Sequence, residues 1–223
     1  MLIPNLAKIA YLHNSKKNEI GYILSNGPSL QNENLSKLKG KENIITLNAS
    51  PLMEEKYGFH SSYYCLTDPR FLEVEQKRKI ALNKLKDKQC YSFCRENLEE
   101  ILSFEGVKPL YLKSLGRDGF SKNLIKGFYF GATTSMLAIQ LAYWLGLKEV
   151  YILGLDLDYL TRGYIRFYDE KVKQVTDLLV SVQIFNISNA ANIFEQEGRK
   201  LYITNPSSWA TPYVDYKPFD LSF

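Results

Sequence analysis

Residues 131–159, GATTSMLAIQLAYWLGLKEVYILGLDLDY, decide the fold class of this chain. The stretch opens with a glycine turn and small polar side chains, and a dense apolar run of helical length follows. A short link then leads into residues 150–153, whose apolar, β-rich sequence is typical of a strand buried on both faces of a parallel sheet. Asp156 and Asp158 follow Gly154, at the place where such a sheet presents its ligand-facing edge.

Residues 21–30, GYILSNGPSL, show the same order of an apolar strand followed by a turn with small polar side chains. Asn26, Gly27, Pro28 and Ser29 offer an amide, a hydroxyl and backbone N–H groups, and the glycine permits a ligand to come close. The turn lacks the lysine of a Walker loop and the spacing of a dinucleotide-binding GxGxxG motif. Two strand ends of this kind suggest a nucleotide site of another type.

Strands and helices alternate along the rest of the chain. This alternation predicts an α/β fold, a single Rossmann-like domain over residues 1–223 with a mostly parallel sheet flanked by helices and a small lid over roughly 157–187. The strands near residues 20, 44, 62 and 149 should be neighbours. We expect strands over 20–24, 43–47, 62–66, 88–93, 109–112, 150–153 and 200–204, helices over 35–38, 71–85, 96–102, 136–145, 171–185 and 188–197, and an irregular loop over 115–127.

Composition narrows the function classes. A net charge of +4 is far from the dense basic stripe of a nucleic-acid binder, so no nucleic-acid partner is expected. Three cysteines and two histidines favour neither a disulfide framework nor a structural zinc site. The sequence shows no signal-peptide pattern and no apolar run of about 18 residues. We therefore expect a cytoplasmic protein, at most peripheral at the inner face of the membrane.

Polar side chains follow several of the expected strands. Asn48 follows the second strand and Asp68 the third, and residues 133–135, Thr-Thr-Ser, precede the central helix. In a parallel sheet the carboxyl ends of the strands meet at one edge, which is the geometry of a small-ligand cleft. We therefore expect Asn26, Ser29, Asn48, Thr134 and Asp156 to line one pocket.

These motifs, in this order, resemble the bacterial sialyltransferases that decorate lipooligosaccharide. The resemblance rests on NGPSL, on Asn48, on Asp-Pro after the third strand, on residues 133–159 and on KLYITNPSS near the end, and it spans about residues 20–208. The wider group includes the Maf-type flagellin glycosyltransferases, some Kdo transferases and the hydroxymethylpterin diphosphokinases. The resemblance implies transfer of a 2-keto acid sugar, of the sialic acid or Kdo type, from a CMP-activated donor to a cell-surface glycan.

The resemblance also implies roles for particular residues. The nucleotide would contact the first turn and two further strand ends, at Asn26, Gly27, Pro28, Ser29, Asn48 and Asp156. The donor sugar would contact Thr133, Thr134 and Ser135, and the departing phosphate would contact tyrosines among Tyr159, Tyr164 and Tyr168. Arg117, Arg162 and Arg166 are available to meet an acidic acceptor or the donor carboxylate. No cofactor and no metal are expected, because the donor is itself the activated substrate.

One departure from the family pattern concerns the general base. The sialyltransferases use a histidine between the two C-terminal helical segments, and this chain has no histidine beyond His60. A carboxylate within hydrogen-bond reach of the acceptor hydroxyl can take its proton, so Asp158 is the first candidate, ahead of Asp68 and His60. If the backbone stays extended after Asp156, the side chain of Asp158 lies on the same face.

Two other functions remain open at this stage. An ATP- and Mg²⁺-dependent pterin diphosphokinase would use Asp68, Asp156 and Asp158 as ligands of a hard cation. A non-catalytic module that binds a sugar nucleotide would account for the missing histidine. A glycan or glycolipid acceptor, and self-association into a homo-oligomer, are further expectations.

Overall fold

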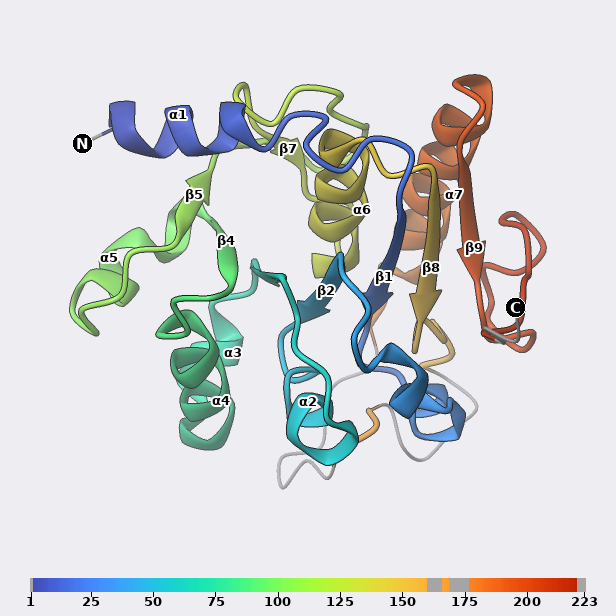
Figure 1. Ribbon diagram of the computed structural model, residues 1–223, viewed down its shortest axis with the longest axis horizontal. Helices are drawn as coiled ribbons and strands as arrows, with labels where there is room; N and C mark the ends of the chain where they lie inside the picture. The colour runs from blue at the N-terminus through green and yellow to red at the C-terminus, as the bar shows by residue number, and fades with distance from the viewer. Residues whose placement is uncertain (1, 160–165, 169–176, 220–223) are drawn as a thin grey trace.

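Seven parallel strands form the central sheet of the protein (Figure 1). The computed structural model describes residues 2–159, 166–168 and 177–219. The strand order is β5-β4-β3-β2-β1-β8-β9, and every pair of neighbours in this sheet is parallel. The predicted α/β class with a parallel sheet is confirmed. The strands are β1 (Ile20–Leu24), β2 (Ile44–Leu47), β3 (Tyr63–Leu66), β4 (Tyr91–Arg95), β5 (Leu110–Leu112), β8 (Glu149–Leu153) and β9 (Lys200–Ile203).

The order of the strands reverses at β1. From β1 the chain adds β2 to β5 on one side, and it then returns to place β8 and β9 on the other side. β1 and β8 are paired along their whole length, from Ile20 with Glu149 to Leu24 with Leu153. The strands predicted near residues 20, 44, 62 and 149 are therefore neighbours, as expected. In open α/β sheets the crevice beyond the carboxyl ends at such a reversal is where ligands bind.

Side chains of successive strand residues pack into two separate cores, one on each face of the sheet. Ile23, Ile45 and Ile152 belong to one buried cluster, whereas their neighbours Tyr22 and Ile44 belong to the other. This alternation follows from the two-residue period of a strand. Both faces are covered, which explains why the strand sequences are continuously apolar.

Helices cover both faces of the sheet (Figure 1). One core takes side chains from α1 (Leu2–Tyr11), α6 (Thr134–Leu145) and α7 (Val180–Gln196). The other takes side chains from α2 (Leu52–Tyr57), α3 (Arg70–Glu73), α4 (Glu75–Leu85), α5 (Glu99–Ser103) and the 3-10 helices η1 (Pro28–Asn32), η2 (Leu35–Leu38) and η3 (Glu96–Leu98). Within the described residues, no helix combines the length and the apolar character needed to cross a membrane.

Three helical segments differ from the prediction. No element was predicted over the first 19 residues, where α1 packs through Ile9, and Leu12, which follows the helix, is also buried in the core. The helix expected over 71–85 is split, because Val74 has extended backbone between α3 and α4. α7 runs through the break expected between 185 and 188. Asn186 there uses its side-chain amide within the fold, donating to the carbonyl of Val182 at 2.8 Å and accepting from the backbone N–H of Gly119 at 2.8 Å.

The segment expected to be an irregular loop, 115–127, lies between the two strands of a small parallel sheet, β6 (Ser114–Gly116) and β7 (Phe128–Tyr129), and β6 overlaps its start. Gln140, fully buried in α6, holds this segment in place. Its side-chain oxygen accepts from the N–H groups of Ser121 at 2.8 Å and Tyr129 at 3.0 Å, and its amide donates to the carbonyl of Tyr129 at 2.8 Å. The polar residue that interrupts the apolar helix is therefore a structural anchor.

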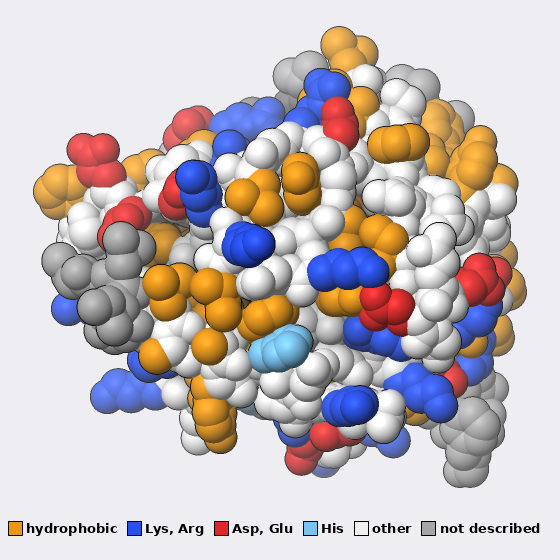
Figure 2. Space-filling model, turned by 90° about the horizontal axis from the view of Figure 1, so that it is seen from above, with side chains coloured by type: hydrophobic (Ala, Val, Ile, Leu, Met, Phe, Trp, Pro, Cys, Tyr) orange, Lys and Arg blue, Asp and Glu red, His pale blue; other side chains and the backbone are white. Residues whose placement is uncertain are grey.

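Figure 2 shows the amino-terminal edge of the sheet from above. Basic and acidic side chains are scattered there among hydrophobic ones, with no continuous basic stripe. The pocket described next lies at the opposite edge.

Candidate functional site

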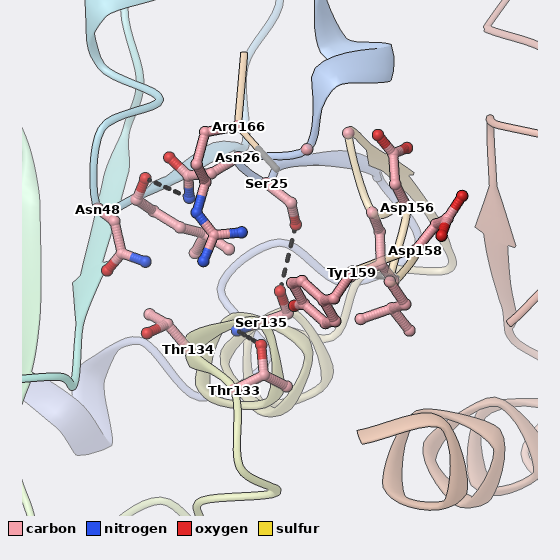
Figure 3. Close-up of a pocket in the computed structure, with 15 residues that line it drawn as sticks. Ser25, Asn26, Asn48, Thr133, Thr134, Ser135, Asp156, Asp158, Tyr159 and Arg166 are labelled. Atoms are coloured by element: carbon pink, nitrogen blue, oxygen red, sulfur yellow. Dashed lines mark hydrogen bonds between the residues drawn. The ribbon is translucent and has the colours of Figure 1, made fainter. Parts of the chain in front are cut away.

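A pocket lies beyond the carboxyl ends of β1, β2 and β8, at the reversal of the strand order (Figure 3). The first turn of α6 forms its floor in the view of Figure 3. Asn26, Asn48 and Arg166 lie on one side, and Asp156 and Asp158 lie on the other. The residues that line the pocket are Ser25, Asn26, Gly27, Leu47, Asn48, Thr133, Thr134, Ser135, Gly154, Leu155, Asp156, Leu157, Asp158, Tyr159 and Arg166.

The turn after β1 is tied to the turn after β2 by the side chain of Asn26. Its amide donates to the carbonyl of Leu47 at 3.2 Å, and its oxygen accepts from the N–H of Ala49 at 3.1 Å. Glycine is required at position 27, because a Cβ there would lie 2.6 Å from the carbonyl oxygen of Gly154. The turn thus brings the ends of β1, β2 and β8 together.

Asp156 is 5% exposed and joins three segments of the chain. Its carboxylate accepts from the backbone N–H of Ser29 at 2.8 Å, from the Ser29 hydroxyl, and from the side-chain amide of Asn205 at 2.6 Å. Four of the five residues expected to share a pocket, Asn26, Asn48, Thr134 and Asp156, do line it. Ser29 does not, because η1 begins at Pro28 and the Ser29 hydroxyl is used to hold Asp156.

Asn48 lines the pocket, and its side-chain oxygen Oδ1 is buried. Its backbone is left-handed, with φ of +48°, a conformation that asparagine tolerates better than most residues. Among the described residues, no hydrogen-bond partner reaches the buried side-chain oxygen Oδ1. A buried acceptor without a donor costs on the order of 1–3 kcal/mol.

Hydroxyl groups surround the first turn of α6. Thr133 caps the helix by accepting from the N–H of Ser135 at 3.3 Å. The Thr134 hydroxyl lies 2.7 Å from that of Thr67, and the Ser135 hydroxyl lies 3.2 Å from that of Ser25. The residue before the cap, Ala132, has left-handed backbone with φ of +57°. The partial positive charge at the amino terminus of a helix makes this end of the pocket favourable for an anion.

The segment after β8 carries Asp158 and Tyr159 into the pocket lining. The backbone is not extended between Asp156 and Asp158, because Leu157 has φ of +57°. We expected an extended backbone to place both carboxylates on one face, but the backbone is not extended there. Asp158 is nevertheless 9% exposed and lines the pocket.

Tyr159 is held from α7. Its hydroxyl donates to the side-chain oxygen of Gln183 at 3.2 Å, and the Gln183 amide donates to Asp177 at 2.6 Å and to the carbonyl of Ala132 at 3.1 Å. Burial raises the pKa of the Tyr159 hydroxyl, while the charge of nearby Arg166 acts in the opposite direction. Tyr159 is therefore a neutral hydroxyl group at neutral pH.

Arg166 reaches the pocket from a segment that follows a gap in the described residues. The backbone N–H of Phe167 donates to the carbonyl of Asn26 at 3.0 Å, and the carbonyl of Phe167 accepts from the side chain of Gln31. Sequence reasoning had named Arg166 only among several available arginines. Its place depends on a contact between residues 26 and 167, and no local pattern predicts such a contact.

Several candidate residues lie outside the pocket. Asp68 follows β3 at the same edge, but its carboxylate is paired with Arg70, with Oδ2 2.7 Å from the guanidinium. His60 precedes β3 and so lies at the amino-terminal edge, where its ring nitrogen is 2.8 Å from Asp87. A base must reach the substrate, and the structure brings neither Asp68 nor His60 into the pocket lining.

The remaining candidates lie outside the pocket lining or outside the described residues. Tyr168 contacts Phe167 and packs against the buried cluster to which α2 and α4 also contribute, and it does not line the pocket. Arg117 is paired with Asp118 at the surface. Tyr164, Arg162 and part of the predicted lid lie outside the described residues. The described part of the chain contains no cluster of three or more histidine, cysteine, aspartate or glutamate side chains that could hold a metal ion.

The family of 6-hydroxymethylpterin diphosphokinase MptE-like proteins matches residues 2–162. The chain belongs to the MptE-like family. The match includes the turn after β1, the α6 turn and β8 with its aspartates, which are the parts that build the pocket. No curated protein matches the chain in sequence.

Several solved structures share the fold of this chain. The sialyltransferase CstII from Campylobacter jejuni, solved with cytidine-5'-monophosphate, is 17% identical with a TM-score of 0.55, covering 93% of this chain and 88% of its own. The α-2,3-sialyltransferase Cst-I from the same organism is 14% identical with a TM-score of 0.52, covering 89% and 80%. The Maf glycosyltransferase from Magnetospirillum magneticum is 10% identical with a TM-score of 0.54, covering 97% of this chain and 38% of its own. At these identities the likeness shows the shared fold, and the expected superfamily is confirmed at that level.

Proposed function

We propose that this protein is a glycosyltransferase that moves a 2-keto acid sugar from a CMP-activated donor to a cell-surface glycan acceptor. The observation that carries the proposal is the pocket at the reversal of the strand order, which joins the side chains of Asn26 and Asn48 to the amino terminus of α6. A nucleoside offers hydrogen-bonding groups for the Asn48 side chain, and a phosphate or carboxylate suits the helix terminus. Related folds are known from sialyltransferases solved with CMP.

The proposed reaction needs one base and stabilisation of one leaving group. The acceptor hydroxyl attacks the anomeric carbon of the donor sugar while the bond from that carbon to the phosphate oxygen breaks. The electron pair of that bond leaves with CMP, and Asp158 takes the acceptor proton. The α6 amino terminus, the nearby hydroxyls and Tyr159 lower the energy of the charge that develops on the phosphate.

The second candidate is an ATP- and Mg²⁺-dependent pterin diphosphokinase, which the name of the family favours. Its metal would need free carboxylate oxygens. Asp156 accepts from three protein donors, and Asp68 is paired with Arg70. A carboxylate surrounded by N–H and O–H donors is poorly placed to bind a cation. These contacts support glycosyl transfer over metal-dependent diphosphate transfer.

Thermal unfolding with CMP, CDP, ATP and GTP, each with and without Mg²⁺, tests the proposal. A ligand that binds only the folded state raises the unfolding temperature. We expect CMP and CDP to do so without Mg²⁺. Stabilisation by ATP that requires Mg²⁺ would favour the diphosphokinase. Stabilisation by CMP without transfer of sialic acid or Kdo from a CMP-activated donor to a glycan acceptor would favour the non-catalytic module.

A further inference from the structure

We propose that Arg166 is the cation that binds the phosphate of the nucleotide, opposite the amino terminus of α6. This inference rests on the proposed function in treating the pocket as a nucleotide site. It gives the chain a positively charged phosphate ligand. Tyr168 is outside the lining, and Tyr159, which lines the pocket, is a neutral hydroxyl that can donate a hydrogen bond but carries no positive charge.

The position of Arg166 is set by its neighbour. Phe167 is 5% exposed and belongs to the buried cluster to which α2 also contributes. Its N–H donates to the carbonyl of Asn26, and its carbonyl accepts from the side chain of Gln31. These contacts tie residue 166 to the turn that we propose contacts the nucleotide. The guanidinium of Arg166 points from beside Asn26 toward the first turn of α6 (Figure 3).

The ring of Tyr159 supports the guanidinium from a second side. The Arg166 guanidinium carbon lies 5.9 Å from the centroid of that ring. Tyr159 is in turn held by Gln183 of α7. Contacts on two sides limit the positions that the long arginine side chain can take, so less conformational entropy is lost when it binds an anion.

The charges around the pocket indicate an anion between Arg166 and α6. The α6 amino terminus is partially positive, and Arg166 faces it across the pocket, as Figure 3 shows. Of the two carboxylates in the lining, Asp156 is satisfied by Ser29 and Asn205, and both lie on the other side of the pocket. A phosphate group has oxygens for both positive groups at once, and arginine binds such oxygens in a bidentate manner.

The backbone contact between Phe167 and Asn26 favours phosphate over the sugar carboxylate as the ligand of Arg166. Arg166 is joined through Phe167 to the Asn26 turn, which we propose contacts the nucleotide. A guanidinium on the nucleotide side of the pocket would bind the group that the sugar leaves behind.

Titration calorimetry with CMP and with cytidine tests the role of Arg166, since the two ligands differ only in the phosphate. In Arg166→Gln we expect CMP affinity to fall by about 10- to 100-fold, and cytidine affinity to change by less than about threefold. Arg166→Lys should keep part of the CMP affinity. The matched control is Arg78→Gln, because Arg78 is an exposed arginine of α4 that is paired with Glu105 and does not line the pocket.

The outcomes separate this inference from the proposed function. If Arg166→Gln binds CMP with the affinity of wild type, the role of Arg166 is overturned and the proposed function stands. An equal loss of CMP and cytidine also overturns it, because the arginine would then act only by holding the segment in place. If wild type binds ADP and not CMP, the proposed donor is wrong, and ADP against adenosine tests Arg166 in the same variants. Failure of wild type to bind any nucleotide overturns both.

Discussion

Among the described residues, two carboxylates line the pocket, Asp156 and Asp158. Asp156 holds the turns together, so Asp158 remains the candidate base. Asp158→Asn keeps the size of the side chain and removes its basicity. We expect the variant to lose about 10²- to 10⁴-fold in transfer rate while its affinity for CMP stays close to that of wild type. Initial rates with a CMP-sugar donor and calorimetry with CMP measure the two quantities.

A matched control is Asp215→Asn, since Asp215 is an exposed carboxylate paired with Lys200. It should leave both transfer and binding unchanged. A transfer rate in Asp158→Asn close to that of wild type would contradict the assignment of the base. The proton would then pass to another group, and Asp68 would be the next to replace.

At the residue scale, the sequence predicted pocket residues correctly at the ends of β1, β2 and β8, whereas Asp68 at the end of β3 lies outside the lining. Asn26, Asn48 and Asp156 follow β1, β2 and β8 and come together for that reason. His60 precedes its strand and lies at the opposite edge. Arg166 was missed as a pocket residue because its place depends on the hydrogen bond from Phe167 to Asn26, between residues far apart in sequence.

At the element scale, α6 joins the pocket to the core. Its first turn carries three hydroxyl residues, and the rest of the helix is almost wholly buried. Thr133→Ala removes the side chain that accepts from the N–H of Ser135. We expect the free energy of unfolding to fall by about 1 kcal/mol, as for other caps of this type. Denaturant unfolding, followed by circular dichroism, measures the change.

Thr133→Ser is the control, because serine also accepts at the cap position, and it should unfold close to wild type. Equal stability of the alanine and serine variants would show that the cap contributes nothing. A loss of CMP-sugar binding in the alanine variant at a temperature where it is fully folded would indicate a direct contact with the donor as well.

The sequence predicts the elements whose hydrophobic pattern lies within one short stretch of the chain. β1, β2, β3, β8 and β9 were found from short apolar runs, and α6 from a dense apolar segment. The break at Val74 between α3 and α4 lies inside a charged, helix-favouring run and left no signal. The continuity of α7 through Asn186 depends on bonds from that side chain to Gly119 and Asp118, which belong to a distant loop.

At the scale of the whole molecule, α1 is held to the core by a contact between residues 9 and 144. The indole N–H of Trp144, at the end of α6, donates to the carbonyl of Ile9 at 2.8 Å. Trp144→Phe removes this donor and keeps an aromatic ring beside His13, whose centroid lies 4.1 Å away. We expect the buried carbonyl left without a partner to cost about 1–3 kcal/mol and α1 to open locally.

Hydrogen exchange over residues 5–12 measures this opening. Tyr143→Phe is the control, because it removes a hydroxyl on the same helix that bonds to Glu197 and does not contact α1. Faster exchange in both variants would point to general loosening of α6, and unchanged exchange in Trp144→Phe would show that the side-chain packing of Ile9 and Leu12 is sufficient.

The left-handed backbone at Ala132 and Leu157 sets a limit on the heat resistance of this protein. A residue with a side chain held in this conformation costs on the order of 1–3 kcal/mol, and glycine adopts it without strain. Whole domains are stable by only about 5–15 kcal/mol, so two such residues take a considerable share. Both stand at turns that shape the pocket. Engineering for higher stability would find gains at these two turns first, and those gains would come at the expense of the rigidity with which the pocket meets its ligand.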